Sequence, residues 1–192
     1  MISRIDHIAI AVKDHEGAER FFRDVLGAIP GGCYEVPRQK FVWQSLVLGD
    51  LTRLELVSPM GGGGLLEGFL SKREGGFHHI TLQTPDLDAA IRRLEEHGIP
   101  YFGRHEYPDG TWKEVFIHPR DAFGVLIQLA EFRPEDWMLP EMKMPEGQRW
   151  DIGKTDAGFT LSLAHPGGGK TAIDLTKEEL RCLSQALQEA LQ

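Results

Sequence analysis

Apolar and polar positions follow the same order in two stretches of the chain, residues 5–27 and 77–98. Each stretch begins with a short alternating run, which is typical of a strand with one buried face, and continues with apolar positions at helical spacing. An aspartate lies between the two parts, Asp14 in the first stretch and Asp86 in the second, where its side chain can cap the first turn of a helix. The chain therefore predicts a strand followed by a helix, present once in each half of an internal repeat.

Three further strand-like runs follow each predicted helix, and turn residues separate them. The runs are residues 32–37, 40–49 and 53–59 in the first half, and 99–105, 111–119 and 124–132 in the second. Each half is thus predicted to be a βαβββ module, residues 1–59 and 77–132, and the two modules pair in one α+β domain, residues 1–132. A glycine-rich linker, residues 60–76, is expected to hold a short helix at residues 65–72.

Residues 133–192 lie outside the repeat and form a predicted C-terminal extension. Residues 133–148 are rich in proline and methionine and indicate an extended arm, and residues 158–175 indicate a hairpin. The last segment begins with Thr176 and has Glu179 at the third position after it, which is the pattern of a helix capping box. The apolar stripe of this helix must be buried somewhere; it consists of Leu180, Leu183, Leu187 and Leu191.

A segment of the extension, "AHPGGGKT" at residues 164–171, matches a relaxed phosphate-loop pattern. A phosphate loop runs directly into a helix whose N-terminus holds the phosphate. Here the strand-like run "TAIDL" follows instead, so a glycine-rich hairpin turn explains the segment better.

The repeat also assigns directions to two adjacent histidines. His79 is the equivalent of His7, and His78 is the equivalent of Asp6. Because successive side chains of a strand point to opposite faces, His7 and His79 are predicted to face inward together. Asp6 and His78 are predicted to face outward.

Each module ends on an apolar strand that carries one polar residue, Glu55 in "LELVSP" and Gln128 in "VLIQLAEF". Glu55 follows His7 at almost the same separation in the sequence as Gln128 follows His79. Equivalent positions of two modules meet when the modules pair about a pseudo-twofold axis, and four inward polar side chains are costly to bury without a common partner. Two imidazoles, a carboxylate and an amide oxygen therefore predict a site for one divalent metal ion.

Composition and charge narrow the classes of function. Hydrophobic residues make up 41% of the chain and charged residues 26%, as in ordinary globular proteins. The net charge of −8 argues against a nucleic-acid surface, and no apolar run approaches the roughly 20 residues that span a membrane. The N-terminus lacks a secretory pattern, and two distant cysteines, Cys33 and Cys182, fit a reduced cytoplasmic protein.

At this point the chain resembles the vicinal oxygen chelate superfamily, which includes glyoxalases, bleomycin-resistance proteins and extradiol dioxygenases, and most of all its methylmalonyl-CoA epimerase-like members. The stretches that carry the resemblance are "IDHIAIAVKD", "FFRDVLGA", "LELVSP", "GGFHHITL" and "FIHPRDAFGVLIQL". The resemblance covers residues 1 to about 132 and implies a curved mixed β-sheet around the metal site. It also implies a homodimer, one divalent ion (Co, Ni, Mn, Zn or Fe), and His7, Glu55, His79 and Gln128 as ligand positions.

The shared chemistry of the superfamily is chelation of two neighbouring substrate oxygens and stabilisation of an enolate by the metal. The resemblance thus implies an isomerase, epimerase or lyase that acts on a small oxygenated acid or its CoA thioester. One residue departs from the pattern: the last ligand position is normally a glutamate that also serves as a base, and here it is Gln128. Because an amide cannot take up a proton near neutral pH, the base must be Glu55 or another group, for which Glu114 is a candidate on position alone.

Other functions remain open at this stage. His7, His79 and Glu55 could form the iron triad of an extradiol-type dioxygenase, although in those enzymes the carboxylate normally comes from the last strand. A non-catalytic small-molecule-binding protein of the same fold is a second alternative, but such members typically lack the metal ligands. A degenerate copy with a structural metal is a third, supported only by Gln128.

Overall fold

The computed structural model describes residues 2–48, 52–108, 110–133, 143–165 and 169–192. The chain separates into two compact units, residues 1–132 and 133–192. No helix in the described ranges is long and apolar enough to cross a membrane.

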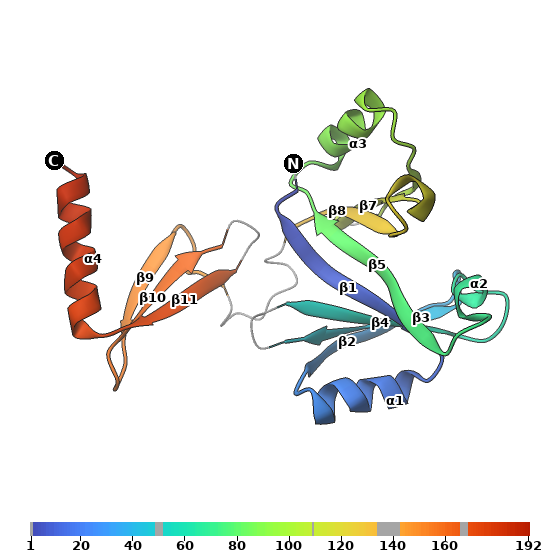
Figure 1. Ribbon diagram of the computed structural model, residues 1–192, viewed down its shortest axis with the longest axis horizontal. Coiled ribbons are helices and arrows are strands. Elements are labelled where there is room, and N and C mark those ends of the chain that lie inside the picture. The colour runs from blue at the N-terminus through green and yellow to red at the C-terminus, as the bar shows by residue number, and fades with distance from the viewer. Residues whose placement is uncertain (1, 49–51, 109, 134–142, 166–168) are drawn as a thin grey trace. The chain divides into compact units, whose positions relative to one another are not determined.

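The first unit contains two copies of the same order of elements (Figure 1). The first copy comprises β1 (Arg4–Val12), α1 (His15–Arg20), the π-helical turn η1 (Phe21–Val25), β2 (Ile29–Val36), β3 (Phe41–Val47) and β4 (Arg53–Pro59). After the short helix α2 (Glu67–Leu70), the second copy comprises β5 (Gly75–Gln83), α3 (Leu87–Glu96), β6 (Phe102–Glu106), β7 (Trp112–Ile117), the 3₁₀ turn η2 (Pro119–Asp121) and β8 (Ile127–Phe132). The predicted βαβββ modules and the linker helix are confirmed, with strand ends that differ slightly from those expected.

The helices begin and end where the sequence indicates. The side chain of Asp14 accepts a hydrogen bond from the first turn of α1, and that of Asp86 accepts one from the first turn of α3. Gly27 and Gly98, which follow the helices, have φ angles of 72° and 65°, a region that costs little only for glycine. The caps therefore fix the entry and exit of each helix next to the strand that precedes it.

One eight-stranded sheet joins the two modules, in the order β2-β3-β4-β1-β5-β8-β7-β6. The sheet is mixed, because β1 pairs with β4 and β5 pairs with β8 in parallel, while the remaining pairs are antiparallel. Read outward from the centre of the sheet, the strands of the first module come in the order β1, β4, β3, β2, and those of the second in the equivalent order β5, β8, β7, β6. This is the arrangement expected for two modules related by a pseudo-twofold axis. Strands β1 and β5 form the seam between the modules.

The two helices cover the outer face of their own modules. Leu87 and Ile91 of α3 pack with Val115, Ile117 and Leu129. Ala18 of α1 and Phe22 of η1 pack with Leu46 and Leu56. Each leucine that is fully buried there contributes about 2 kcal/mol of transfer free energy. These two clusters leave the opposite face of the central strands free to hold polar residues.

A third cluster covers one end of that inner face. Leu66 and Leu70, at α2, pack against Ala11 of β1 and Val57 of β4, beside Trp43. The linker helix thus lies against the same face of the strands that carries the candidate polar residues.

The second unit contains a three-stranded antiparallel sheet and a helix: β9 (Trp150–Lys154), β10 (Phe159–Ala164), β11 (Lys170–Leu175) and α4 (Lys177–Ala190). Strands β10 and β11 are the predicted hairpin, and β9 was missed by the sequence reasoning. The predicted capping box of Thr176 and Glu179 opens α4. Leu187 and Leu191 of the apolar stripe are exposed within their own unit, and most of the predicted arm lies outside the described residues.

Candidate metal centre

Three of the four predicted ligands meet at the seam of the sheet. His7 comes from β1, Glu55 from β4 and His79 from β5, and one ligand atom of each lies within 4.8 Å of the others. The register explains the meeting, because Ala9 of β1 is the partner of both Glu55 and His79 on its two neighbouring strands. Side chains of neighbouring strands at such positions lie on one face of the sheet.

The Nε2 atom of His79 is the observation that tests whether this cluster fits a metal ion. It is buried, and it has no hydrogen-bond partner in the described part of the chain. Buried polar atoms in folded proteins almost always have a partner, and an imidazole nitrogen next to a second imidazole and a carboxylate is a preferred ligand of a divalent metal. The residues present therefore fit a metal ion.

His7 presents its Nε2 atom to the same place. This atom lies 3.7 Å from Oε2 of Glu55 and 2.9 Å from the hydroxyl oxygen of Thr81. Burial raises the pKa of Glu55, and electrostatic interactions with His7 and Arg53 oppose that rise. Burial also lowers the pKa of His79 well below its usual value, which favours the neutral imidazole that binds metals.

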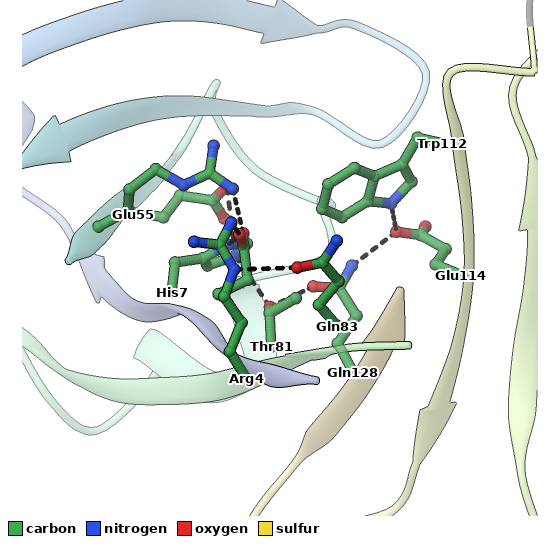
Figure 2. A network of polar contacts seen from close by, with 10 residues as sticks. Arg4, His7, Glu55, Thr81, Gln83, Trp112, Glu114 and Gln128 are labelled. Carbon is green, nitrogen blue, oxygen red and sulfur yellow. Dashed lines mark hydrogen bonds and ion pairs between the residues drawn. The ribbon is translucent and has the colours of Figure 1, made fainter. Parts of the chain in front are cut away.

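The fourth predicted ligand, Gln128, lies next to this cluster on β8, in register with Thr81. Its amide oxygen accepts a hydrogen bond from Thr81, and its amide nitrogen donates one to Oε2 of Glu114 at 2.6 Å (Figure 2). The same oxygen of Glu114 accepts a hydrogen bond from the indole of Trp112 at 2.8 Å. The structure thus connects Glu114 to the site through Gln128, and the orientation of the amide is set by partners on both sides.

The prediction that Asp6 faces outward is wrong. Asp6 is only 2% exposed; Nδ1 of His7 lies 2.8 Å from its Oδ2 atom, and it forms ion pairs with Arg4 and Arg53. The register of β1 against β5 shifts between Ile5 and His7, so a bulge breaks the alternation on which the prediction relied. Burial raises the pKa of Asp6, but the hydrogen bond from His7 and the charge of Arg53 outweigh it and bring the pKa to about 2.

His78 is half-buried beside the site and is not one of the three clustered residues. Its Nδ1 atom lies 2.9 Å from Nδ1 of His79, and its ring packs edge-on against Phe69 at 5.0 Å between centroids. Sequence reasoning gave neither Asp6 nor His78 a role. The available signal was their equivalence in the repeat, one position before each histidine.

Comparisons with known proteins find relatives of the first unit. Residues 6–116 match the model of the Glyoxalase/Bleomycin resistance protein/Dioxygenase superfamily. The chain is 37% identical over 134 residues to the ethylmalonyl-CoA/methylmalonyl-CoA epimerase of Cereibacter sphaeroides. The alignment covers 68% of this chain and 99% of that protein. The chain is 34% identical over 137 residues to the mitochondrial methylmalonyl-CoA epimerase of Mus musculus, covering 68% and 74% of the two chains.

Solved structures give the same picture. The crystal structure of methylmalonyl-CoA epimerase from Mycobacterium tuberculosis superposes with a TM-score of 0.63 at 30% identity, over 71% of this chain and 92% of that one. The similarity in both kinds of comparison covers about the length of the first unit, and the eight-stranded sheet described above is the fold of these neighbours.

Proposed function

The chain belongs to the glyoxalase/bleomycin resistance protein/dioxygenase superfamily, and from this premise we propose that it is a metal-dependent epimerase-like isomerase or lyase. Its proposed substrate is a small oxygenated acid carried as a CoA thioester, the class on which the similar epimerases are named to act. The observation that carries the proposal is the cluster of His7, Glu55 and His79, in which the buried Nε2 atom of His79 has no hydrogen-bond partner among the described residues.

In this proposal His7, Glu55 and His79 hold one divalent ion, and the Gln128 amide oxygen is the fourth candidate ligand. Such an ion, when bound, supplies a Lewis acid that stabilises negative charge on a substrate oxygen. Its identity is left among cobalt, nickel, manganese, zinc and iron, since imidazole and carboxylate ligands suit all of these.

The proton transfer falls to carboxylates, because the amide of Gln128 cannot accept a proton. We assign Glu114 as the group that takes the proton from the carbon next to the substrate carbonyl. Its Oε2 atom accepts hydrogen bonds from Gln128 and Trp112, which leaves Oε1 as the oxygen that these two bonds do not use. Glu55, as a ligand and a partly buried carboxylate, is the second candidate for a proton-carrying group.

A single acceptor, Glu114 or in its place Glu55, favours proton exchange over the two-base route, in which groups on opposite faces of the substrate remove and return the proton. The test is incubation of the metal-loaded protein with single-enantiomer methylmalonyl-CoA in deuterated water, with each metal supplied in turn. We expect deuterium uptake that depends on the metal and is lost in Glu114→Gln, with slow or no racemisation. Rapid racemisation would refute the single-acceptor assignment, and no exchange with any of the five metals would refute the proposed activity on this substrate.

A second candidate function is an extradiol-type dioxygenase, favoured by the composition of the cluster, two histidines and one carboxylate. This set of ligands is typical of non-haem iron(II) oxygenases. Oxygen consumption with iron(II) and a catechol would support this alternative, and its absence together with the exchange described above would exclude it.

A further inference from the structure

We propose that Asp6 and His78, the residues immediately before the two candidate histidine ligands, are positioning residues. Each fixes the ring of the histidine that follows it, so that the Nε2 atom of that ring faces the metal. This inference rests on the proposed function, because it concerns how the same site is held in the geometry that binds the ion.

In the first module the contact is between a carboxylate and an imidazole. Oδ2 of Asp6 lies 2.8 Å from Nδ1 of His7. An ionised carboxylate only accepts hydrogen bonds, so the proton of this contact belongs to Nδ1 of His7. The other ring nitrogen, Nε2, is the one that faces Glu55 and Thr81, and coordination at Nε2 replaces its hydrogen bond to Thr81.

Asp6 is itself held in place by two arginines, one on each of its carboxylate oxygens. Arg4 forms an ion pair with Oδ1 at 2.9 Å and Arg53 forms one with Oδ2, and the side chain of Asp6 is completely buried. Arg4 is fixed in turn by a 2.9 Å hydrogen bond to Gln83 of β5 (Figure 2). These contacts fix the position of the carboxylate, and its contact with Nδ1 in turn fixes the orientation of the His7 ring.

In the second module two imidazoles make the equivalent contact. Nδ1 of His78 lies 2.9 Å from Nδ1 of His79, a distance at which one nitrogen donates and the other accepts. When Nδ1 of His79 is the donor, its Nε2 atom carries a lone pair, and this is the buried atom without a hydrogen-bond partner in the described residues. Phe69 packs against the ring of His78 and fixes the acceptor.

The two contacts are equivalent by position and different in chemistry. Asp6 and His78 occupy the same place in the two copies of the repeat, and each meets the Nδ1 atom of its neighbour. Partners of this kind fix which nitrogen of a ligating histidine is protonated and how the ring is turned, and their loss typically lowers metal affinity about 10- to 100-fold. A carboxylate also makes the histidine a stronger electron donor, so Asp6 is expected to have the larger effect of the two.

The experiment uses the full chain labelled with ¹⁵N in its histidines and loaded with zinc, which is diamagnetic. Long-range ¹H–¹⁵N correlation spectra distinguish a protonated ring nitrogen from a metal-bound one. We expect His7 and His79 each to show a protonated Nδ1 and a zinc-bound Nε2. In His78→Ala, the zinc Kd should rise about 10- to 100-fold and the signal of the Nδ1 proton of His79 should broaden or disappear, while the spectrum of His7 stays unchanged.

Two conservative variants separate orientation from packing. Asparagine and glutamine can each accept a hydrogen bond through the amide oxygen, so His78→Gln should restore most of the affinity that His78→Ala loses. Asp6→Asn keeps the shape of the buried side chain and should weaken zinc binding while the protein stays folded. His97→Ala removes an exposed histidine at the end of α3 and serves as the control, for which no change is expected.

The possible failures are distinguishable. If the wild-type protein binds no zinc, both the metal site of the proposed function and this inference are refuted. If zinc binds at His7 and His79 but Kd stays within a factor of two in all the Asp6 and His78 variants, only the positioning role is refuted. Coordination of either histidine through Nδ1 would overturn the inference in the same way.

Discussion

The hydrogen bond between Gln128 and Glu114 predicts how the metal-free protein will respond to Gln128→Glu. The amide nitrogen of Gln128 lies 2.6 Å from Oε2 of Glu114, so the substitution places a second carboxyl group against the first. Two full charges at that distance repel by about 6 kcal/mol at an effective dielectric constant of about 20. Keeping one proton on a carboxyl group at pH 7 costs about 4 kcal/mol, from a reference pKa of about 4.3. Because protonation costs less than the repulsion between two charges, the carboxyl groups at positions 114 and 128 will share one proton in the folded variant.

The sign of the pH dependence follows from this proton. Above a pH of about 5 the unfolded variant has released it and the folded variant has not, so the free energy of unfolding falls by about 1.4 kcal/mol per pH unit. We expect Gln128→Glu to lose about 3 kcal/mol relative to wild type between pH 5 and pH 7.5. The measurement is urea unfolding at several pH values in the presence of a chelator.

Gln128→Ala is the matched control, because it removes the same hydrogen bonds and adds no charge. Its loss of stability should be nearly independent of pH. Added zinc should reverse much of the loss in Gln128→Glu at pH 7.5, since a carboxylate there can bind the ion. A difference between the two variants that does not change with pH would refute the reasoning, and with it the close contact between positions 128 and 114.

Three further predictions concern the rest of the chain. With metal in excess, His79→Ala should abolish stoichiometric metal binding and His78→Ala should not, as measured by metal analysis of protein purified without an affinity tag; equal metal content in the two variants would contradict the assignment. Truncation after Phe132 should change the oligomer size or lower the melting temperature and leave metal binding intact, and an unchanged mass and melting point would argue against a packing role for the extension. Gly75→Ala should lower the free energy of unfolding by more than the ~1 kcal/mol typical of point substitutions, because a Cβ at Gly75 would lie 2.9 Å from the backbone oxygen of Ala11; thermal unfolding that matches wild type would show that the seam can open there at no cost.

The arrangement of the modules could be predicted from sequence because the repeat carries the same signal twice. Asp14 and Asp86 cap their helices as the pattern requires, and the equivalence of His7 and His79 placed both on one face from the residue pattern alone. A single strand histidine would not have supported that conclusion. Two copies related by symmetry can pair in few ways. The local pattern of each copy was therefore enough to predict the long-range proximity of His7 and His79.

Asp6 shows where such reasoning fails. Alternation assigns its side chain to the outer face, but the bulge between Ile5 and His7 is a property of the pairing between two strands and has no signature in either one alone. The link from Gln128 to Glu114 has the same character, since it depends on the register of β7 against β8. The extension shows a different limit. Strand β9 has few apolar residues and, among the described strands, pairs with β10 alone, so its pattern resembles that of a loop.

The position of the site on the seam between β1 and β5 has a consequence for how the protein assembles. His7 and Glu55 belong to one module and His79 and Gln128 to the other, so each half of the chain carries two of the four positions and neither carries a working set. The complete proposed metal site therefore forms when two strands from different halves of the chain have paired, and long-range contacts of this kind are slow to form in folding. Two fragments, residues 1–74 and 75–192, would each bind metal weakly, and the ion would promote their association because their complex would bind it more tightly than either fragment does.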